Sequence, residues 1–310
     1  MTNRYVAMIK RELWENRSIF VTPAAIASIV VLGVLTAIVL ASTFWRELPV
    51  VIFGTTNLVD EFDRRVILSI IFGGTSSLFL VALAILTTFY CLDSLYTERR
   101  DKSILFWRSM PVTDTETVLS KLVTAVFIIP LITIAAIIAT NILNLILISI
   151  WVSMKGGDAG FLIWGSAPFI DNWVAMFTAV IALSIWVSPF IAWFLFVSAF
   201  TRKWPFLVAF LPPILAMLGE RIIFKSTILF STVVLERGKV PLFSSGLTFE
   251  EFFEIFFTDG QVAKGGELIG MLAQIDLAKF FSSPGLWLGL VACGLFTTAA
   301  IYVRRFRDDS

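Results

Sequence analysis

The charged residues of this chain gather in one stretch, and their types limit the chemistry that the chain can do. Residues 98–121 read ERRDKSILFWRSMPVTDTETVLSK, in which acids and bases surround a short apolar, aromatic core. The 310 residues include no histidine, so imidazole bases, Ser-His triads and histidine metal sites are excluded. No G-x-x-x-x-G-K-[ST] segment occurs, which excludes a P-loop of the chain's own. We therefore expect no catalytic, cofactor-binding or metal-binding residues.

The composition indicates an integral membrane protein. Hydrophobic residues make up 58% of the chain and charged residues 15%, whereas soluble domains average roughly half and a quarter. A net charge of +1 gives no basis for binding nucleic acid. Cys91 and Cys293 lie in apolar runs without C-x-x-C spacing, so we interpret them as buried side chains.

Six apolar runs approach or exceed the length of about 20 residues that a spanning helix needs. We predict one transmembrane domain over 1–310, with spans at about 20–42, 67–92, 122–151, 173–200, 204–224 and 284–303. Pro130, Pro189 and the Pro212-Pro213 pair should kink their helices. The predicted fold class is an all-α polytopic membrane protein.

Three further helical regions are predicted outside the spans. Tyr5, Ile9 and Leu13 recur every four residues, which favours an N-terminal helix lying in the membrane interface. Two helices are expected between the second and third spans. The outer loop, 225–283, contains two amphipathic segments, LTFEEFFEIFF and ELIGMLAQIDLAKFF, that favour helices near the outer leaflet.

Loop charges predict the orientation. Lys and Arg concentrate before the first span, between the second and third spans, and after the sixth. Because cytoplasmic loops carry the excess of Lys and Arg, we predict that both termini are cytoplasmic and that 225–283 lies outside.

The stretch between the second and third spans has the pattern of two helices joined at a proline. Ser103–Met110 is short and amphipathic, Pro111 ends it, and Thr113-x-x-Glu116 is a capping box that starts a helix leading into the third span. An ordinary positive-inside loop would explain the charges. It would not explain the apolar and aromatic residues at the tip, which favour docking on a membrane or a partner.

The pattern L-Y-x-E-R-R-D-x-S-I-L-F-W-x-S-x-P-V-x-D-x-E-x-V-L-S-K resembles the cytoplasmic signature of type-two permeases of ATP-binding cassette transporters. Lys102 and Ser103 stand where many members have Gly-Thr, which places the chain in a sub-branch. The resemblance implies a permease that pairs with a second copy or a paralogue and with ATP-binding subunits. The residues that it implies for coupling to the ATPase are Glu98, Arg99, Arg100, Asp101, Ile104, Leu105, Trp107, Arg108 and Pro111.

Polar side chains within or at the ends of the spans are candidates for lining a translocation pathway. These are chiefly Thr140, Asn141, Asn144 and Glu220, with Thr87 and Thr88 in the second span. Hydrogen bonding and packing between helices is the plainer interpretation. Gly285 and Gly289 form a G-x-x-x-G match, which favours ordinary packing over a dedicated dimer face.

The predicted function is the permease subunit of an ATP-driven exporter in a bacterial inner membrane, with direction and setting implied by the resemblance. ATP would act through the partner subunit, and membrane lipid would surround the chain. The alternative is a self-sufficient carrier, channel or lipid-modifying protein. A carrier should show related halves and buried carboxylates, and an enzyme should show a catalytic cluster; the sequence has neither signal. The substrate stays open among lipid-like, amphipathic and peptide molecules.

Overall fold

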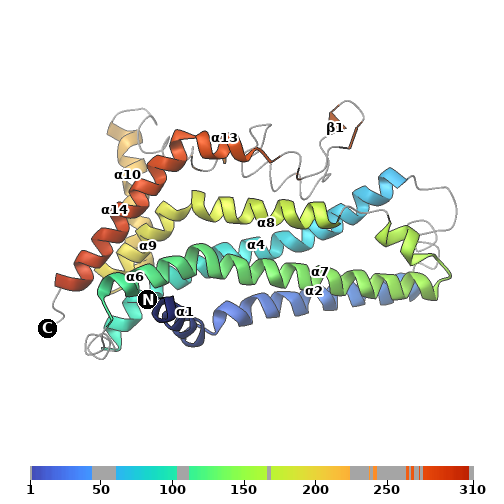
Figure 1. Ribbon diagram of the computed structural model, residues 1–310, viewed down its shortest axis with the longest axis horizontal. Coiled ribbons are helices and arrows are strands. Elements are labelled where there is room, and N and C mark those ends of the chain that lie inside the picture. The colour runs from blue at the N-terminus through green and yellow to red at the C-terminus, as the bar shows by residue number, and fades with distance from the viewer. Residues whose placement is uncertain are drawn as a thin grey trace.

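The protein is described by a computed structural model that covers residues 2–43, 61–102, 112–165, 169–223, 237, 240–242, 263–264, 267–268, 272 and 275–306. These residues form a helical bundle (Figure 1), and six of its segments are long and apolar enough to cross a membrane. This confirms the predicted fold class and the number of spans. The six segments are Ser18–Thr43, Gly73–Arg100, Asp114–Met154, Gly160–Trp186, Pro205–Ile222 and Pro284–Phe306.

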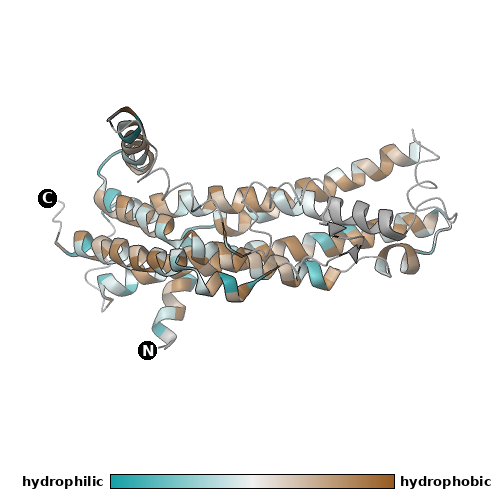
Figure 2. Ribbon diagram, turned by 90° about the horizontal axis from the view of Figure 1, so that it is seen from above, coloured by the Kyte–Doolittle hydropathy of each residue, from teal (hydrophilic) through white to brown (hydrophobic). Residues whose placement is uncertain are grey.

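Four long helices run side by side along the bundle: α2 (Ser18–Thr43), α4 (Glu61–Arg100), α7 (Ile129–Met154) and α8 (Phe169–Trp186). A short π-helix, η2 (Gly160–Trp164), lies between α7 and α8 in the chain. Apolar residues dominate the ribbon along the bundle (Figure 2). Exposed side chains on the long helices are accordingly often large and apolar, which suits contact with lipid hydrocarbon.

Helix α1 (Thr2–Glu15), helix α6 (Asp114–Val123) and the last turns of α14 (Pro284–Phe306) meet at one end of the bundle. Helix α6 begins at the predicted capping box. The Thr113 hydroxyl accepts a hydrogen bond from the Glu116 N–H at 3.2 Å, and the Glu116 carboxylate accepts one from the Thr113 N–H at 2.8 Å. The position of α1 in a membrane interface stays a prediction.

The third span is continuous but changes its winding at a proline. A π-helix, η1 (Thr124–Ile128), lies between α6 and α7 and ends two residues before Pro130. Proline lacks the N–H that would bond the carbonyl four residues earlier, at Val126. The wider π-turn takes up this irregularity inside the helix.

The predicted span at 173–200 is divided in the structure. Helix α8 ends at Trp186, and α9 (Ser188–Phe200) begins after Val187, next to Pro189. Because Pro189 removes a hydrogen bond at the junction, the carbonyls at the end of α8 need other donors.

Helix α10 (Pro205–Ile223) runs through Pro212 and Pro213 without a break. Pro213 has no N–H for the carbonyl of Ala209. The indole Nε1 of Trp193, on α9, donates to that carbonyl at 3.1 Å. The neighbouring helix therefore supplies the hydrogen bond that the proline removes.

Much of the outer loop, including the predicted helix at 247–257, lies outside the described residues. The predicted helix at 267–281 is corrected in part. Among the described residues of this range, α13 (Leu277–Ser282) is an α-helix, whereas β2 (Glu267–Leu268) pairs antiparallel with β1 (Ala263–Lys264).

Candidate functional site: an ion network and a pocket

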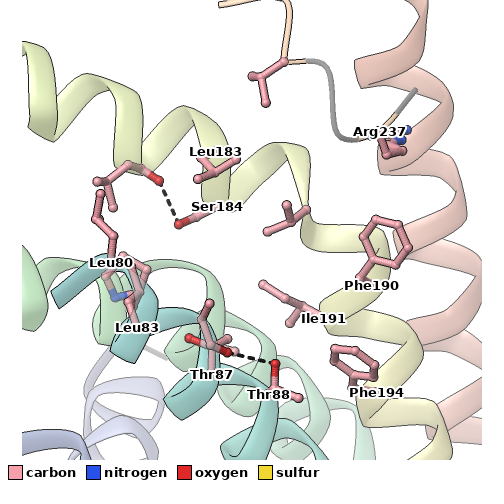
Figure 3. Close-up of a pocket in the computed structure, with 16 residues that line it drawn as sticks. Leu80, Leu83, Thr87, Thr88, Leu183, Ser184, Phe190, Ile191, Phe194 and Arg237 are labelled. Carbon is pink, nitrogen blue, oxygen red and sulfur yellow. Dashed lines mark hydrogen bonds between the residues drawn. The ribbon is translucent and has the colours of Figure 1, made fainter. Parts of the chain in front are cut away.

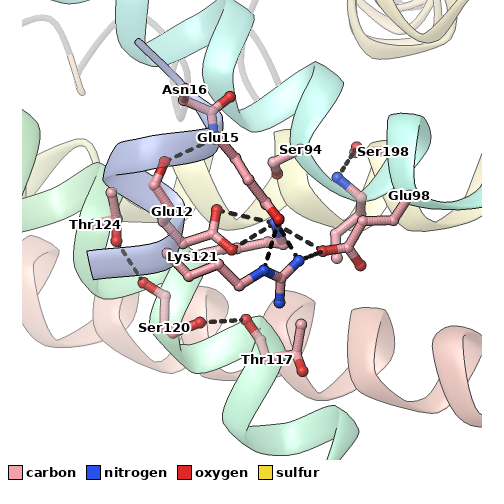
Figure 4. A network of polar contacts seen from close by, with 12 residues as sticks. Glu12, Glu15, Asn16, Ser94, Glu98, Thr117, Ser120, Lys121, Thr124 and Ser198 are labelled. Atoms are coloured by element: carbon pink, nitrogen blue, oxygen red, sulfur yellow. Dashed lines mark hydrogen bonds and ion pairs between the residues drawn. The ribbon is translucent and has the colours of Figure 1, made fainter. Parts of the chain in front are cut away.

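Buried charged side chains join α1, α4, α6 and α14 at the end of the bundle (Figure 4). The Lys121 Nζ lies 2.9 Å from a carboxylate oxygen of Glu12 and 3.1 Å from one of Glu98. The guanidinium of Arg304 contacts Glu98 at 2.5 Å and Asp114 at 2.8 Å. Lys121 and Glu12 are each 1% exposed, and Glu98 and Arg304 are each 5% exposed. We call these five residues the inner ion network.

Two residues extend the inner ion network from α1 and α4. The Tyr90 hydroxyl donates to Glu12 at 3.0 Å. Arg11 pairs with Glu98 at 3.1 Å and with Glu15 at 2.8 Å. Burial alone lowers the pKa of the Arg11 guanidinium, but Glu15 and Glu98 more than offset that effect, so its pKa is raised. Arg11 therefore stays charged and holds α1 against α4.

The inner ion network fastens helices that are far apart in the sequence. Each buried charge has an opposite partner within hydrogen-bond distance. Removing one member of such a group strands the others in a medium that solvates them poorly, which is strongly destabilising. The inner ion network therefore holds α1, α4, α6 and α14 together at this end of the bundle.

The predicted coupling residues take different positions. Glu98 belongs to the inner ion network and is buried, so the plain interpretation of a solvated loop charge is wrong for this residue. Arg100 and Asp101 are exposed and pair with each other at 3.0 Å. Ile104, Leu105, Trp107, Arg108 and Pro111 lie outside the described residues. Coupling to an ATPase stays a prediction for all nine.

Arg99 and Ser198 fasten α4 to α9. The Arg99 guanidinium donates to the carbonyls of Ser198 at 2.9 Å and Thr201 at 2.5 Å, where the end of α9 leaves carbonyls without helical partners. The buried Ser198 hydroxyl accepts hydrogen bonds from the backbone N–H groups of Leu95 and Tyr96, at 3.1 and 2.9 Å. Helix α9 thus joins the same end of the bundle.

A pocket of about 430 Å³ lies between α4, η1, α8 and α9 (Figure 3). Its volume is in the range of roughly 300–1,000 Å³ that small-molecule sites occupy. Both helix irregularities are in its wall, since Ala125 of η1, Pro130 and Val187 all line it. A shape change at either irregularity would change the pocket.

The candidates for lining a pathway are split between the pocket and the packed interior. Thr87 and Thr88 line the pocket, whereas Thr140, Asn141, Asn144 and Glu220 do not. Thr140 donates to its own helix at Ala136, and Asn141 accepts from Thr75 at 3.4 Å. The amide of Asn144 makes no hydrogen bond to any residue that the structure describes. Glu220 is buried near the end of α10. A pathway role stays a prediction for these four residues.

Sequence analysis missed Glu12, Arg304 and Arg237 as residues that hold the structure together. Arg237 donates to the carbonyls of Trp186 at 3.0 Å and Gly285 at 2.5 Å. Trp186 returns a bond from its indole Nε1 to the Arg237 carbonyl at 2.8 Å. In the sequence, Glu12 is a charge on a predicted helix, Arg304 a charge at the end of a span, and Arg237 a charge in the outer loop. Charges at such positions fit a solvated surface equally well.

Residues 65–170 of the chain match the family described as ABC-2 family transporter protein. The matched segment includes Glu98, Asp114 and Lys121 of the inner ion network. Neither the curated proteins nor the solved structures gave a significant match. The family match over residues 65–170 and the six apolar helices together support a multi-pass membrane protein that is similar to the permeases of ABC transporters.

Proposed function

We propose that the chain is the permease subunit of an exporter in a bacterial inner membrane, driven by a separate ATP-binding subunit and paired with a second permease copy or a paralogue. The observation that carries the proposal is the inner ion network. Glu98 precedes the segment 103–111, and Asp114 and Lys121 follow it. Because both flanks are tied to the same buried charges, a push on 103–111 by a partner would move α1, α4, α6 and α14 together.

The same helices lead from the inner ion network to the pocket, where we place the cargo. Lys121 lies four residues before Ala125, which lines the pocket, and four residues are about one helical turn. On the other side, Ser198 ties α4 to α9, whose Phe190 and Phe194 also line it. Displacement at the inner end would therefore reach both walls.

The orientation has a direct test, with both termini proposed to be cytoplasmic. Lys10 and Lys155 are exposed, on α1 and at the end of α7. In a background without Cys91 and Cys293, Lys155→Cys should react with an impermeant maleimide in intact cells. Lys10→Cys should react only after permeabilisation. Labelling of both from the same side would exclude the six-span topology.

Docking of the ATP-binding subunit should depend on Trp107. Large aromatic anchors dominate such interfaces, so Trp107→Ala should weaken docking by about 2 kcal/mol or more. Trp287→Ala is the matched control, because Trp287 is exposed at the start of α14. The measurements are co-purification of the ATPase and substrate-stimulated ATP hydrolysis. Wild-type behaviour of Trp107→Ala in both assays would show that 103–111 is only a connecting loop.

A further inference from the structure

We propose that the pocket takes a neutral, largely apolar molecule, rejects ions of either sign, and offers its ligand one free hydroxyl proton, at Thr87. The inference rests on the proposed function in treating the pocket as the cargo site, and it adds the chemical class of the cargo. The inference follows from the apolar lining of the pocket and from the hydrogen bonds that its polar lining residues already make.

Most of the wall is hydrocarbon. Leu80 and Leu83 face the pocket from α4, Leu183 from α8, and Phe190 and Phe194 from α9 (Figure 3). Aliphatic and aromatic surface of this kind binds by removing apolar area from water. A ligand of matching shape therefore needs little polar recognition.

The hydroxyls in the wall are mostly occupied. Thr88 donates to the carbonyl of Ala84 at 2.8 Å, and Ser184 donates to the carbonyl of Val180 at 2.8 Å. Both bonds stay within one helix, so neither hydroxyl proton is offered to a ligand. The hydroxyl of Thr87 makes no hydrogen bond within the described part of the chain. It is the hydroxyl among the described wall residues whose proton is free for a ligand.

The guanidinium of Arg237, the cation in the wall, is turned away from the interior of the pocket. In Figure 3 the guanidinium of Arg237 points toward α14. It donates to the carbonyls of Trp186 and Gly285 and lies 4.6 Å from the centre of the Trp186 ring. The hydrogen bonds of its guanidinium therefore go to the end of α8 and the start of α14 rather than into the pocket. The pocket lining contains no acid among the described residues, so a cationic ligand finds no counter-charge either.

A charged ligand would lose its hydration in this pocket without gaining a new partner. Complete loss of hydration would lower its affinity by several powers of ten. With partial access of water, we expect a neutral ligand to bind at least about 30-fold more tightly than an ion with the same apolar body. Removing the hydrogen bond at Thr87 should weaken binding of a neutral alcohol about five-fold.

Three probes with one fused-ring body test the inference: pyrenebutanol, pyrenebutanoate and pyrenebutylammonium. Binding is measured by fluorescence anisotropy on the detergent-solubilised full chain, without ATP. Leu183→Trp, or the milder Leu183→Phe, fills the pocket. The binding that remains in these variants is uptake of the probe by detergent micelles. Melting temperatures check that each variant is folded. Site-specific binding is the signal that these variants lose.

We expect tighter site-specific binding of pyrenebutanol than of either ion, a five-fold loss in Thr87→Val, and a clearly smaller loss in Thr88→Val, whose hydroxyl proton is already bonded to Ala84. Tighter binding of pyrenebutanoate, lost in Arg237→Gln, would overturn the inference, as would equal losses in the two threonine variants. Unchanged binding of all three probes in both Leu183 variants would also overturn it. Because these measurements need neither ATP nor a partner, failure to find an ATP-binding subunit would refute the proposed function alone.

Discussion

Lys121→Met should lower the free energy of unfolding by about 3–5 kcal/mol, the usual cost of stranding buried charges. Lys121 is 1% exposed, and its Nζ is shared by Glu12 and Glu98. Methionine matches the length of the lysine stem but cannot neutralise either carboxylate. The measurement is thermal unfolding of the detergent-solubilised chain, together with the yield of monodisperse protein.

Two comparisons distinguish the effect of disrupting the inner ion network from the effect of removing any lysine. Lys10→Met removes an exposed lysine of α1 and should change stability by no more than about 0.5 kcal/mol. Adding Glu12→Gln to Lys121→Met removes one stranded charge and should recover part of the loss. If Lys121→Met melted like the wild type, the inner ion network would not hold these helices together.

The elements that could be predicted from the sequence are those with a local cause. A bilayer needs about 20 apolar residues for each spanning helix, so the six spans are visible in the composition of each segment. The capping box at Thr113 and Glu116 depends on a spacing of three residues, and the structure has both of its hydrogen bonds. Neither inference requires knowledge of what packs against the segment.

The inner ion network could not be predicted, because its members are distant in the chain. Lys121 meets Glu12 across 109 positions, and Arg304 meets Glu98 across 206. A lysine or arginine near the inner end of a span satisfies the positive-inside rule whether it is solvated or paired inside the bundle. The polar residues of the third span are ambiguous in the same way. The sequence around Asn141 would be the same whether its side chain lined a pathway or contacted Thr75.

Prolines give a second example of what depends on neighbours. Pro189 lies at a break between helices, while α10 continues through Pro213. Each proline removes the same backbone donor. At Pro213 the indole of Trp193 supplies the missing hydrogen bond. At the break next to Pro189, the guanidinium of Arg237 bonds the carbonyl of Trp186, which is open because α8 ends there. The sequence shows the loss of a donor, but only the packing shows what replaces it.

Gly289→Ala should destabilise the protein by at least about 2 kcal/mol, although alanine is the better helix former. A Cβ built at Gly289 would overlap the guanidinium of Arg237. The guanidinium would have to leave the carbonyls of Trp186 and Gly285, and hydrogen bonds from a charged donor contribute roughly 1.5–3 kcal/mol each. The glycine of the G-x-x-x-G match is therefore expected to make room for Arg237.

The sign of the effect should reverse once Arg237 is removed. In an Arg237→Ala background, Gly289→Ala should stabilise by roughly 0.5–1 kcal/mol, because only the helix preference of alanine over glycine remains. Gly294→Ala, on the same helix with nothing within 4 Å of a built Cβ, should give that small gain in both backgrounds. Unfolding of the four variants of the cycle measures the coupling. The same sign for Gly289→Ala in both backgrounds would mean that Arg237 can move aside without loss, and that Gly289 is not needed to accommodate it.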